Sequence, residues 1–135
     1  MAAKRGRGPL IAVVVVVIIA IAAVGLYYAY YGTSKPSTTT INIASGTATN
    51  QALNFNPSSI TVVVGKNNTI EFTNNDNTLH TVTFTSAPSG VSLSSISTSG
   101  LSAGSTFTIT LTAPGTYHFK CSIHPWMSGT ITVVS

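Results

Sequence analysis

The sequence contains little charge. Eight of its 135 residues are Asp, Glu, Lys or Arg, which is 6%, whereas an ordinary globular domain has about 25%. Four of the six basic residues lie within residues 1–35, and residues 36–135 combine two lysines with Glu71 and Asp76 for a net charge of zero. Because the chain has no dense basic face, it lacks the electrostatic footprint of a protein that binds nucleic acid.

Cysteine is nearly absent. Cys121 is the single cysteine, which excludes an internal disulfide framework, a Cys-x-x-Cys redox pair and a zinc or iron–sulfur site built from several cysteines. In an exported protein, a lone cysteine is expected either to pair with another chain or to bind a metal. The length allows one domain of ordinary size.

Hydroxyl groups replace the missing charge. The chain has 21 Thr and 17 Ser, all of them after Gly32. With only Glu71 and Asp76 to protonate, we expect the charge of this part of the chain to change little in acid. Such a neutral, hydroxyl-rich domain suits an acidic exterior, and it should dock through apolar contact and not through charge steering.

A long apolar run lies near the N-terminus. Residues 10–31 carry no charge, and as a helix they would span about 33 Å, enough to cross the hydrocarbon core of a bilayer. The basic residues of segment 1–9 predict a cytoplasmic N-terminus and an outer location for everything after the helix. The tyrosines at the end of the run suit the outer membrane interface. We therefore predict a single transmembrane helix that acts as a signal anchor.

Two other interpretations of this run remain open. Ala20-Ile21-Ala22 matches the small-x-small pattern of a cleaved secretory signal, but the apolar run continues for nine residues beyond it, which favours a retained anchor. The basic residues and glycine before the apolar run also resemble the class III signal of archaeal pilins. That resemblance implies a filament or surface structural subunit, processed near Gly8 and Pro9.

After the apolar run, the composition predicts a tether and then a β domain. Residues 32–40 are rich in Gly, Pro, Ser and Thr, as flexible linkers are, and can extend at most about 30 Å. Residues 41–135 contain short runs rich in Thr, Val, Ile and Phe, separated by Asn, Gly and Pro turns. The predicted strands are 41–44, 52–55, 60–64, 69–73, 80–85, 106–112, 116–121 and 130–134. They predict an antiparallel sandwich or barrel, with an irregular insertion at 86–104.

One group of residues has the chemistry of a metal site. Cys121, His124 and Met127 follow one another at intervals of three at the end of a predicted strand, so the loop between them can bring all three side chains to one point. His80 begins a distant predicted strand and supplies a second imidazole, because His118 is expected to face outward. Each of these residues alone has an ordinary structural interpretation, but His₂Cys with a weak Met is typical of blue copper centres.

The segments around these residues resemble the cupredoxin family. The likeness runs over residues 55–133, through FNPSSITVVVG, NNDNTLHTVTF and APGTYHFKCSIHPWMSGTITV, and is similar to plastocyanin, amicyanin and halocyanin, with an amicyanin-like ligand interval. It implies an all-β fold, a Greek-key β-sandwich of eight strands with one type 1 copper ion at one end, preceded here by the transmembrane α-helix. The ligands implied by the resemblance are His80, Cys121, His124 and Met127.

Two positions depart from the family pattern. The residue after the first ligand is commonly Asn, which ties the two ligand loops together, and here it is Thr81. The residue before that ligand is commonly Pro, and here it is Leu79. Neither substitution removes a ligand. Each replaces a residue that, in the family, helps to set the rigidity of the ligand loop and the redox potential.

The predicted function is one-electron transfer without catalysis, since neither a general base nor a substrate cleft is indicated. The resemblance makes His124 the ligand nearest solvent, and Pro125 and Trp126 would form an apolar docking patch, unless Trp126 belongs to the core. An anchored carrier would exchange electrons with membrane redox complexes, such as a quinol-oxidising complex or a terminal oxidase, and would need no small-molecule substrate. The competing function is copper transfer or storage. A fragment of a multicopper oxidase is disfavoured because additional His-x-His pairs are absent.

Overall fold

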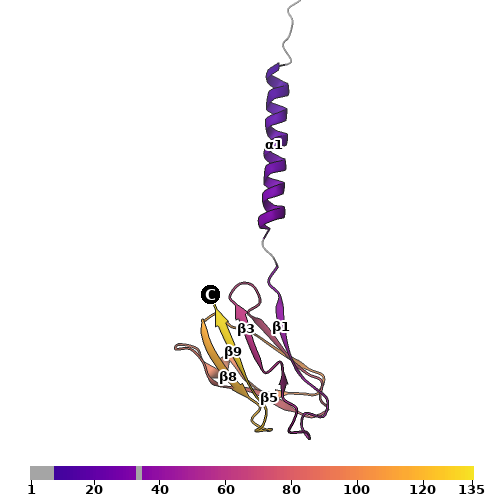
Figure 1. Cartoon of the computed structure of the whole chain (residues 1–135), viewed down its shortest axis with the longest axis vertical. Helices are drawn as coiled ribbons and strands as arrows, with labels where there is room; N and C mark the ends of the chain where they lie inside the picture. The colour runs from indigo at the N-terminus through magenta and orange to yellow at the C-terminus, as the bar shows by residue number, and fades with distance from the viewer. Residues whose placement is uncertain (1–7, 33–34) are drawn as a thin grey trace, which may run out of the picture. The chain divides into compact units, whose positions relative to one another are not determined.

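The computed structural model describes residues 8–32 and 35–135, which belong to two separate compact units (Figure 1). The first unit holds one helix, and the second, Lys35–Ser135, holds a β domain. Most of the predicted cytoplasmic segment 1–9, with its basic residues, lies outside the described residues, as do residues 33–34 of the predicted tether.

The helix of the first unit is α1, Gly8–Tyr31. Its 24 residues correspond to a length of about 36 Å. Its side chains from Ile11 onward are exposed and none of them is charged. By length and composition, Ile11–Tyr31 can cross a membrane, which makes α1 a candidate membrane span, as predicted; a signal sequence shares these two properties.

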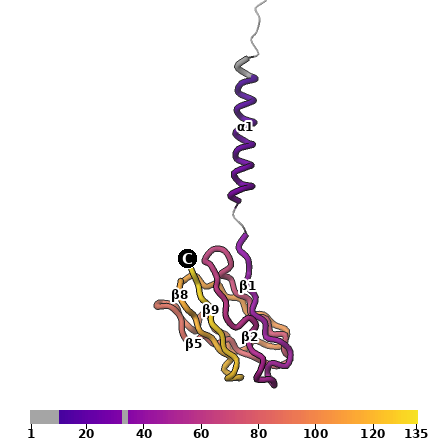
Figure 2. The backbone as a smooth tube through the Cα atoms, viewed as in Figure 1, coloured from indigo at the N-terminus to yellow at the C-terminus, as the bar shows by residue number. Residues whose placement is uncertain are grey.

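The second unit is a β-sandwich (Figures 1 and 2). Its strands are β1 (Thr38–Ile43), β2 (Phe55–Asn56), β3 (Ser59–Val63), β4 (Thr69–Asn74), β5 (His80–Ser86), β6 (Thr98–Leu101), β7 (Thr106–Thr110), β8 (Gly115–Lys120) and β9 (Ser128–Val134). One sheet has the order β2-β1-β4-β7 and the other the order β3-β9-β8-β5-β6. The predicted β-sandwich is confirmed.

The sheets are mixed, which corrects the expectation of purely antiparallel pairing. β1 pairs with β4 and β3 pairs with β9 in parallel, while the remaining pairs are antiparallel. Two parallel strands cannot be joined by a tight hairpin and need a longer crossover connection. Alternation of apolar residues reports which face of a strand is buried but not the direction of its neighbour, so the sequence pattern did not reveal these pairs.

Three segments differ most from the prediction. β1 begins at Thr38, inside the predicted tether, because its threonines pair with β4. Only the end of the predicted strand 52–55 is extended, as β2. The segment 86–104 is more regular than expected, since it contains a 3-10 helix, η1 (Leu93–Ile96), and strand β6. Ile96 and Leu101 are buried and Ala87 and Val91 pack against the core, so a few apolar residues hold this Ser/Gly-rich segment against the core.

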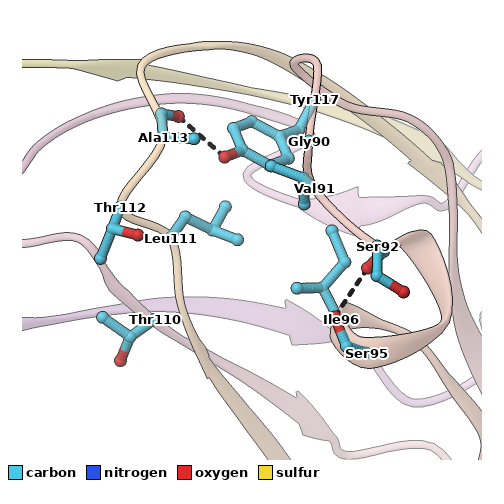
Figure 3. A pocket seen from close by; sticks show the side chains of 10 residues that line it. All are labelled: Gly90, Val91, Ser92, Ser95, Ile96, Thr110, Leu111, Thr112, Ala113 and Tyr117. Atoms are coloured by element: carbon cyan, nitrogen blue, oxygen red, sulfur yellow. Dashed lines mark hydrogen bonds between the residues drawn. The ribbon is translucent and has the colours of Figure 1, made fainter.

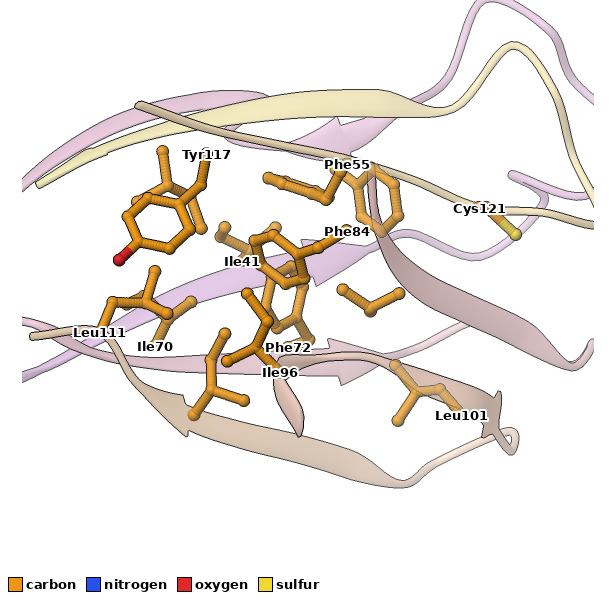
Figure 4. Close-up of a cluster of buried hydrophobic side chains, with 14 of the residues drawn as sticks. Ile41, Phe55, Ile70, Phe72, Phe84, Ile96, Leu101, Leu111, Tyr117 and Cys121 are labelled. Carbon is orange, nitrogen blue, oxygen red and sulfur yellow. The ribbon is translucent and has the colours of Figure 1, made fainter. Parts of the chain in front are cut away.

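The core between the sheets is aromatic in its centre (Figure 4). The ring of Phe119 packs against Phe55 at a centroid distance of 4.9 Å and against Phe72 at 5.3 Å, both edge-to-face. Gly129 lies opposite Phe119 in β9, and a Cβ there would contact the Phe119 ring and lie 2.7 Å from the carbonyl oxygen of Ser58. Only glycine therefore allows this ring to pack beneath the start of β9.

Candidate metal centre

Two neighbouring strands bring His80 and Cys121 together. β5 begins with His80, β8 ends just before Cys121, and the two strands are antiparallel neighbours in which Thr83 lies opposite Lys120. Because antiparallel strands place the start of one beside the end of the other, side chains 41 residues apart meet at one end of the sandwich. Figure 4 shows Cys121 at this end of the core, beyond the aromatic side chains.

The loop after β8 turns His124 back toward this point. The N–H of Met127 donates to the carbonyl oxygen of His124, and the N–H of Cys121 donates to the carbonyl oxygen of Met127, each at 3.0 Å. The Asn54 side chain makes two further bonds of 2.9 Å to the backbone of Ser128, one as donor and one as acceptor. The loop is thus closed at both ends by hydrogen bonds.

Three donor atoms converge at the end of the sandwich. The Nδ1 atoms of His80 and His124 are 3.1 Å apart, and Sγ of Cys121 lies 3.8 Å from the first and 3.5 Å from the second. All three side chains are buried, and the donor atoms lie within 4.8 Å of one another. Transition-metal bonds to imidazole nitrogen and thiolate sulfur are about 2.0–2.3 Å long, as zinc sites show. Two atoms that bind the same ion at such bond lengths lie farther from each other than from the ion. The donor–donor separations of 3.1 to 3.8 Å are of that size, so the donor set fits one ion.

Met127 is the fourth residue that the sequence predicted for the site. Its side chain is fully buried, and its backbone closes the loop that carries Cys121 and His124. Imidazole, thiolate and thioether together are the soft donor set that copper favours.

Sequence reasoning missed a residue behind His80. Oδ2 of Asp76 lies 2.9 Å from Nε2 of His80, and Asp76 is only 3% exposed. The sequence counted Asp76 among the two acids of the domain that could be protonated, and the structure places its carboxyl group in the interior and not on the surface. The Asp76–His80 interval of four residues gave no signal by itself, because a loop and not a helix connects the two positions.

The environment of Asp76 favours its ionised form. Burial raises the pKa of this carboxyl, but the hydrogen bond with His80 and bonds from three backbone N–H groups outweigh burial and hold its pKa well below the usual range. The three N–H donors belong to Ala48, Gly46 and Asn77.

The second imidazole is favoured in its neutral form. Burial, followed by the nearby His80 ring, lowers the pKa of His124, while the charge of Asp76 acts in the opposite direction. A neutral imidazole keeps a lone pair free for a metal, whereas a protonated one cannot bind it.

Thr81 makes the link between the ligand loops that Asn is expected to make. Its hydroxyl oxygen accepts a hydrogen bond of 2.7 Å from the backbone N–H of Ser122 and lies 2.9 Å from the Ser122 hydroxyl. Its own backbone N–H donates to Sγ of Cys121 at 3.4 Å. A shorter side chain therefore still connects the two loops, because β5 and β8 are direct neighbours at this point.

The surface around His124 is apolar. Leu79 and Ile123, which flank His80 and His124 in sequence, are 44% and 48% exposed, and Pro125 is also exposed. We call these three residues the apolar rim. Trp126 is half-buried, packs against the core and has its ring centroid 5.3 Å from that of His124. Pro125 is thus exposed, as the expected docking patch requires, while Trp126 lies partly in the core.

A pocket of about 330 Å³ lies elsewhere in the domain (Figure 3). Its lining includes Val91, Ile96, Leu111 and Tyr117, and the Tyr117 hydroxyl donates to the carbonyl oxygen of Ala113 at 2.8 Å. Tyr117 precedes Cys121 by four residues, a distance of about 13 Å along a strand. The pocket is therefore separate from the three donor atoms.

The sequence of the chain is similar to known copper proteins. Residues 10–133 match the family described as Cupredoxin-like domain. Plastocyanin of Daucus carota is 42% identical over 88 residues, covering 61% of this chain and 89% of that protein. Plastocyanin of Prochlorothrix hollandica is 37% identical over 101 residues, covering 72% of this chain and 75% of that protein. The match to chloroplastic plastocyanin of Oryza sativa, 44% identical and 58% of this chain, spans 54% of that protein.

Solved structures show the same fold. A purple cupredoxin from Nitrosopumilus maritimus superposes with a TM-score of 0.59 at 27% identity, covering 71% of this chain and 99% of that one. A reduced amicyanin variant gives a TM-score of 0.57 over 73% of this chain and 83% of that one, and at 22% identity it shows the fold alone. A copper-containing nitrite reductase from Thermus scotoductus gives 0.58 at 27% identity over 76% of this chain, which spans 23% of that enzyme.

Proposed function

The chain belongs to the cupredoxin family, and we propose that it is a membrane-anchored type 1 copper protein that carries single electrons on the outer face of a membrane. Cupredoxins of the plastocyanin type are electron-transfer proteins that bind one type 1 copper ion and pass electrons to redox partner proteins. The observation that carries the proposal is the convergence of two imidazole nitrogens and one thiol sulfur, all buried, within 4.8 Å of one another.

We assign His80, Cys121 and His124 as the ligands and Met127 as the fourth, weak ligand. Bound copper supplies the exchange of one electron between Cu(I) and Cu(II). The β5–β8 pair and the hydrogen-bonded loop hold the donor residues in place, so little rearrangement of the protein should accompany a change of oxidation state. Such pre-organisation, with the hydrophobic shell and the hydrogen bond to Sγ, tunes a site for electron transfer.

His124 is the proposed point of electron exchange with partners. It is 8% exposed, whereas the other donor side chains are fully buried, and exposed Ile123 and Pro125 of the apolar rim precede and follow it in the loop. An apolar surface allows a partner to approach without displacing tightly held water from charged groups. Because few charges lie on the domain, docking should depend weakly on salt.

Helix α1 supports the proposed location of the β domain at a membrane and the proposal that its partners lie in the same membrane. If α1 is retained as a signal anchor, segment 1–9 is cytoplasmic, the part of the predicted tether 32–40 that precedes β1 connects the helix to the β domain, and the domain lies on the extracellular or periplasmic side. The proposed partners are then redox complexes of the same membrane, such as a quinol-oxidising complex or a terminal oxidase.

We propose no catalytic residue. Within residues 8–32 and 35–135, one group of His, Cys, Asp and Glu side chains has metal-binding spacing, and the described pocket beside Tyr117 is remote from it. The nitrite reductase neighbour is an enzyme, but this chain spans less than a quarter of it.

Copper loading of the full chain in detergent tests the metal centre. Addition of Cu(II) should produce an intense visible thiolate-to-copper band that is abolished in Cys121→Ser. His118→Ala is the matched control, because His118 is exposed and bonds to Thr130 outside the donor set; it should keep the band. A band that survives Cys121→Ser would refute the proposed site. Rapid transfer of the metal to a chelator would favour copper transfer or storage over electron transfer.

Membrane fractionation with mass analysis of the N-terminus tests the anchor. The intact chain should remain in membranes after a carbonate wash, and a variant that begins at Lys35 should be released. A mature N-terminus after Ala22 would show a cleaved signal. A mature N-terminus at Pro9, together with pelletable filaments, would establish the alternative of a filament subunit, which the long uncharged face of α1 also suits.

A further inference from the structure

We infer that Asp76 is a positioning residue of the metal centre, whose carboxylate fixes the ring of His80 and lowers the reduction potential of the bound copper. The inference rests on the proposed copper function and concerns a residue outside the ligand set. Oδ2 of Asp76 accepts a hydrogen bond of 2.9 Å from Nε2 of His80. On the other side of the same ring, Nδ1 faces Sγ of Cys121 at 3.8 Å.

The carboxylate determines which nitrogen of His80 carries the proton. A carboxylate can only accept hydrogen bonds, so Nε2 must be the donor and Nδ1 keeps the free lone pair. Metal-binding histidines commonly donate their second N–H to a carboxylate or a carbonyl, which fixes the ring orientation and raises the basicity of the ligand. In this chain the acceptor is a full negative charge and not a neutral carbonyl.

Asp76 is itself held in place from several sides. Oδ1 accepts from the N–H groups of Gly46 and Asn77 at 3.0 and 2.9 Å, and Oδ2 accepts from that of Ala48 at 2.9 Å. The N–H of Asp76 donates to Oδ1 of Asn74 at 3.0 Å. Gly46 has a φ of 85°, a conformation that favours glycine, in the turn that presents the N–H groups of Gly46 and Ala48 to the carboxylate. The carboxylate cannot turn away from His80 without losing several hydrogen bonds.

The charge of Asp76 is unusual for this domain. The chain has two acidic residues; Glu71 is half-buried on β4, whereas Asp76 is buried. Removing a carboxylate from water is costly unless its hydrogen bonds compensate, and water and salt screen such a buried charge only weakly. A negative charge one imidazole ring away from the ion stabilises the more positive oxidation state. Asp76 should therefore favour Cu(II) and lower the potential.

Redox titration tests the effect of the Asp76 charge on the reduction potential. It compares the unaltered full-length chain, Asp76→Asn and Glu71→Gln, each loaded with copper in detergent. Asp76→Asn should favour reduction by at least tenfold in the equilibrium constant, which for one electron is 59 mV. Glu71→Gln removes the same charge from the same domain and should shift the constant by less than twofold. An unchanged potential in Asp76→Asn, with the blue band intact, would overturn the inference while leaving the proposed function standing.

Proton-detected nitrogen NMR of the unaltered chain tests the positioning independently of any variant. In both metal-free and Cu(I)-loaded protein, Nε2–H of His80 should appear downfield and exchange slowly with water, whereas the ring of exposed His118 should exchange rapidly. Fast exchange at His80 would overturn the inference even if Asp76→Asn failed to fold. Absence of a blue band in the unaltered protein would refute the copper function instead, and the metal-free spectrum would still decide whether Asp76 fixes the ring.

Discussion

The two histidines of the metal centre are held by different parts of the molecule. His80 begins a strand in the interior of a sheet, is fully buried, and has its far nitrogen bonded to Asp76. His124 lies in the loop between β8 and β9, is slightly exposed, and packs its ring against Trp126. Within the described residues, its ring nitrogens have contacts of hydrogen-bond length only with the other two donor side chains.

This difference separates two tasks within one site. The sheet and the Asp76 network fix one imidazole, so they determine the geometry and the electrostatic field at the metal. The loop presents the other imidazole to the surface within the apolar rim, so it determines access. Electron transfer requires both, because a rigid site keeps rearrangement small and an exposed edge allows a partner to come close. Four predictions test whether the two sides differ as described.

The largest difference is expected when each imidazole is removed. In copper-loaded His124→Gly, added imidazole should restore the blue band, because the missing ring lies beside the surface. In His80→Gly the same concentration should restore little, since the position is fully buried and the carboxylate of Asp76 loses its partner at a cost of about 3 kcal/mol. The absorbance of the blue band during titration with imidazole measures the recovery in each variant. Equal recovery in the two variants would contradict the distinction between a fixed and an accessible ligand.

A charge placed in the apolar rim should slow electron exchange. Ile123→Lys makes two copies of the protein repel each other where their His124 edges must meet. The rate of electron self-exchange between Cu(I) and Cu(II) forms, measured by NMR line broadening, should fall by about tenfold and recover with added salt. Val134→Lys is the control, because Val134 is also exposed but lies at the far end of β9. If both variants slow exchange equally, the rim is not the docking surface.

Loss of Asn74 should destabilise the fixed side of the site. Its buried amide donates to the carbonyl oxygens of Thr78 and Leu101, each at 2.8 Å, and truncation leaves these acceptors without partners. Asn74→Ala should lower the free energy of unfolding by about 3 kcal/mol. Urea unfolding followed by the fluorescence of Trp126 measures this. The exposed neighbour provides the control, and Asn75→Ala should change stability by less than about 0.5 kcal/mol.

The smallest effect is expected at Thr81, whose hydroxyl connects the strand that carries His80 to the loop that carries His124. Thr81→Val removes the hydroxyl that accepts from the Ser122 N–H and should cost about 1–2 kcal/mol, with a small shift of the visible band. Thr81→Ser keeps the hydroxyl and should retain most of the stability. If Val and Ser behave alike in urea unfolding, the hydroxyl does not connect the loops.

Much of the fold could be predicted from the sequence because buried and exposed side chains alternate along a strand. The alternation around His118 predicted its outward direction, and the structure confirms that it is exposed while its neighbours Tyr117 and Phe119 are buried. Where apolar residues are sparse, the same rule failed. β6 and the first half of β1 consist mainly of Ser, Thr and Gly and are ordered by their partner strands, so no local pattern marks them.

The sequence by itself determined the apolar helix, the β-sandwich, and the choice of His80, Cys121 and His124 as residues whose donor atoms converge, because hydrophobic periodicity and donor chemistry are properties of short segments. The tertiary structure decided what surrounds those donors. Asp76 is a buried partner of His80 and not a surface acid because a turn 28 to 30 residues earlier supplies N–H groups to its carboxylate. Thr81 replaces the expected Asn because β5 and β8 lie side by side. Such contacts depend on how distant segments pair, and spacing along the chain does not encode that pairing.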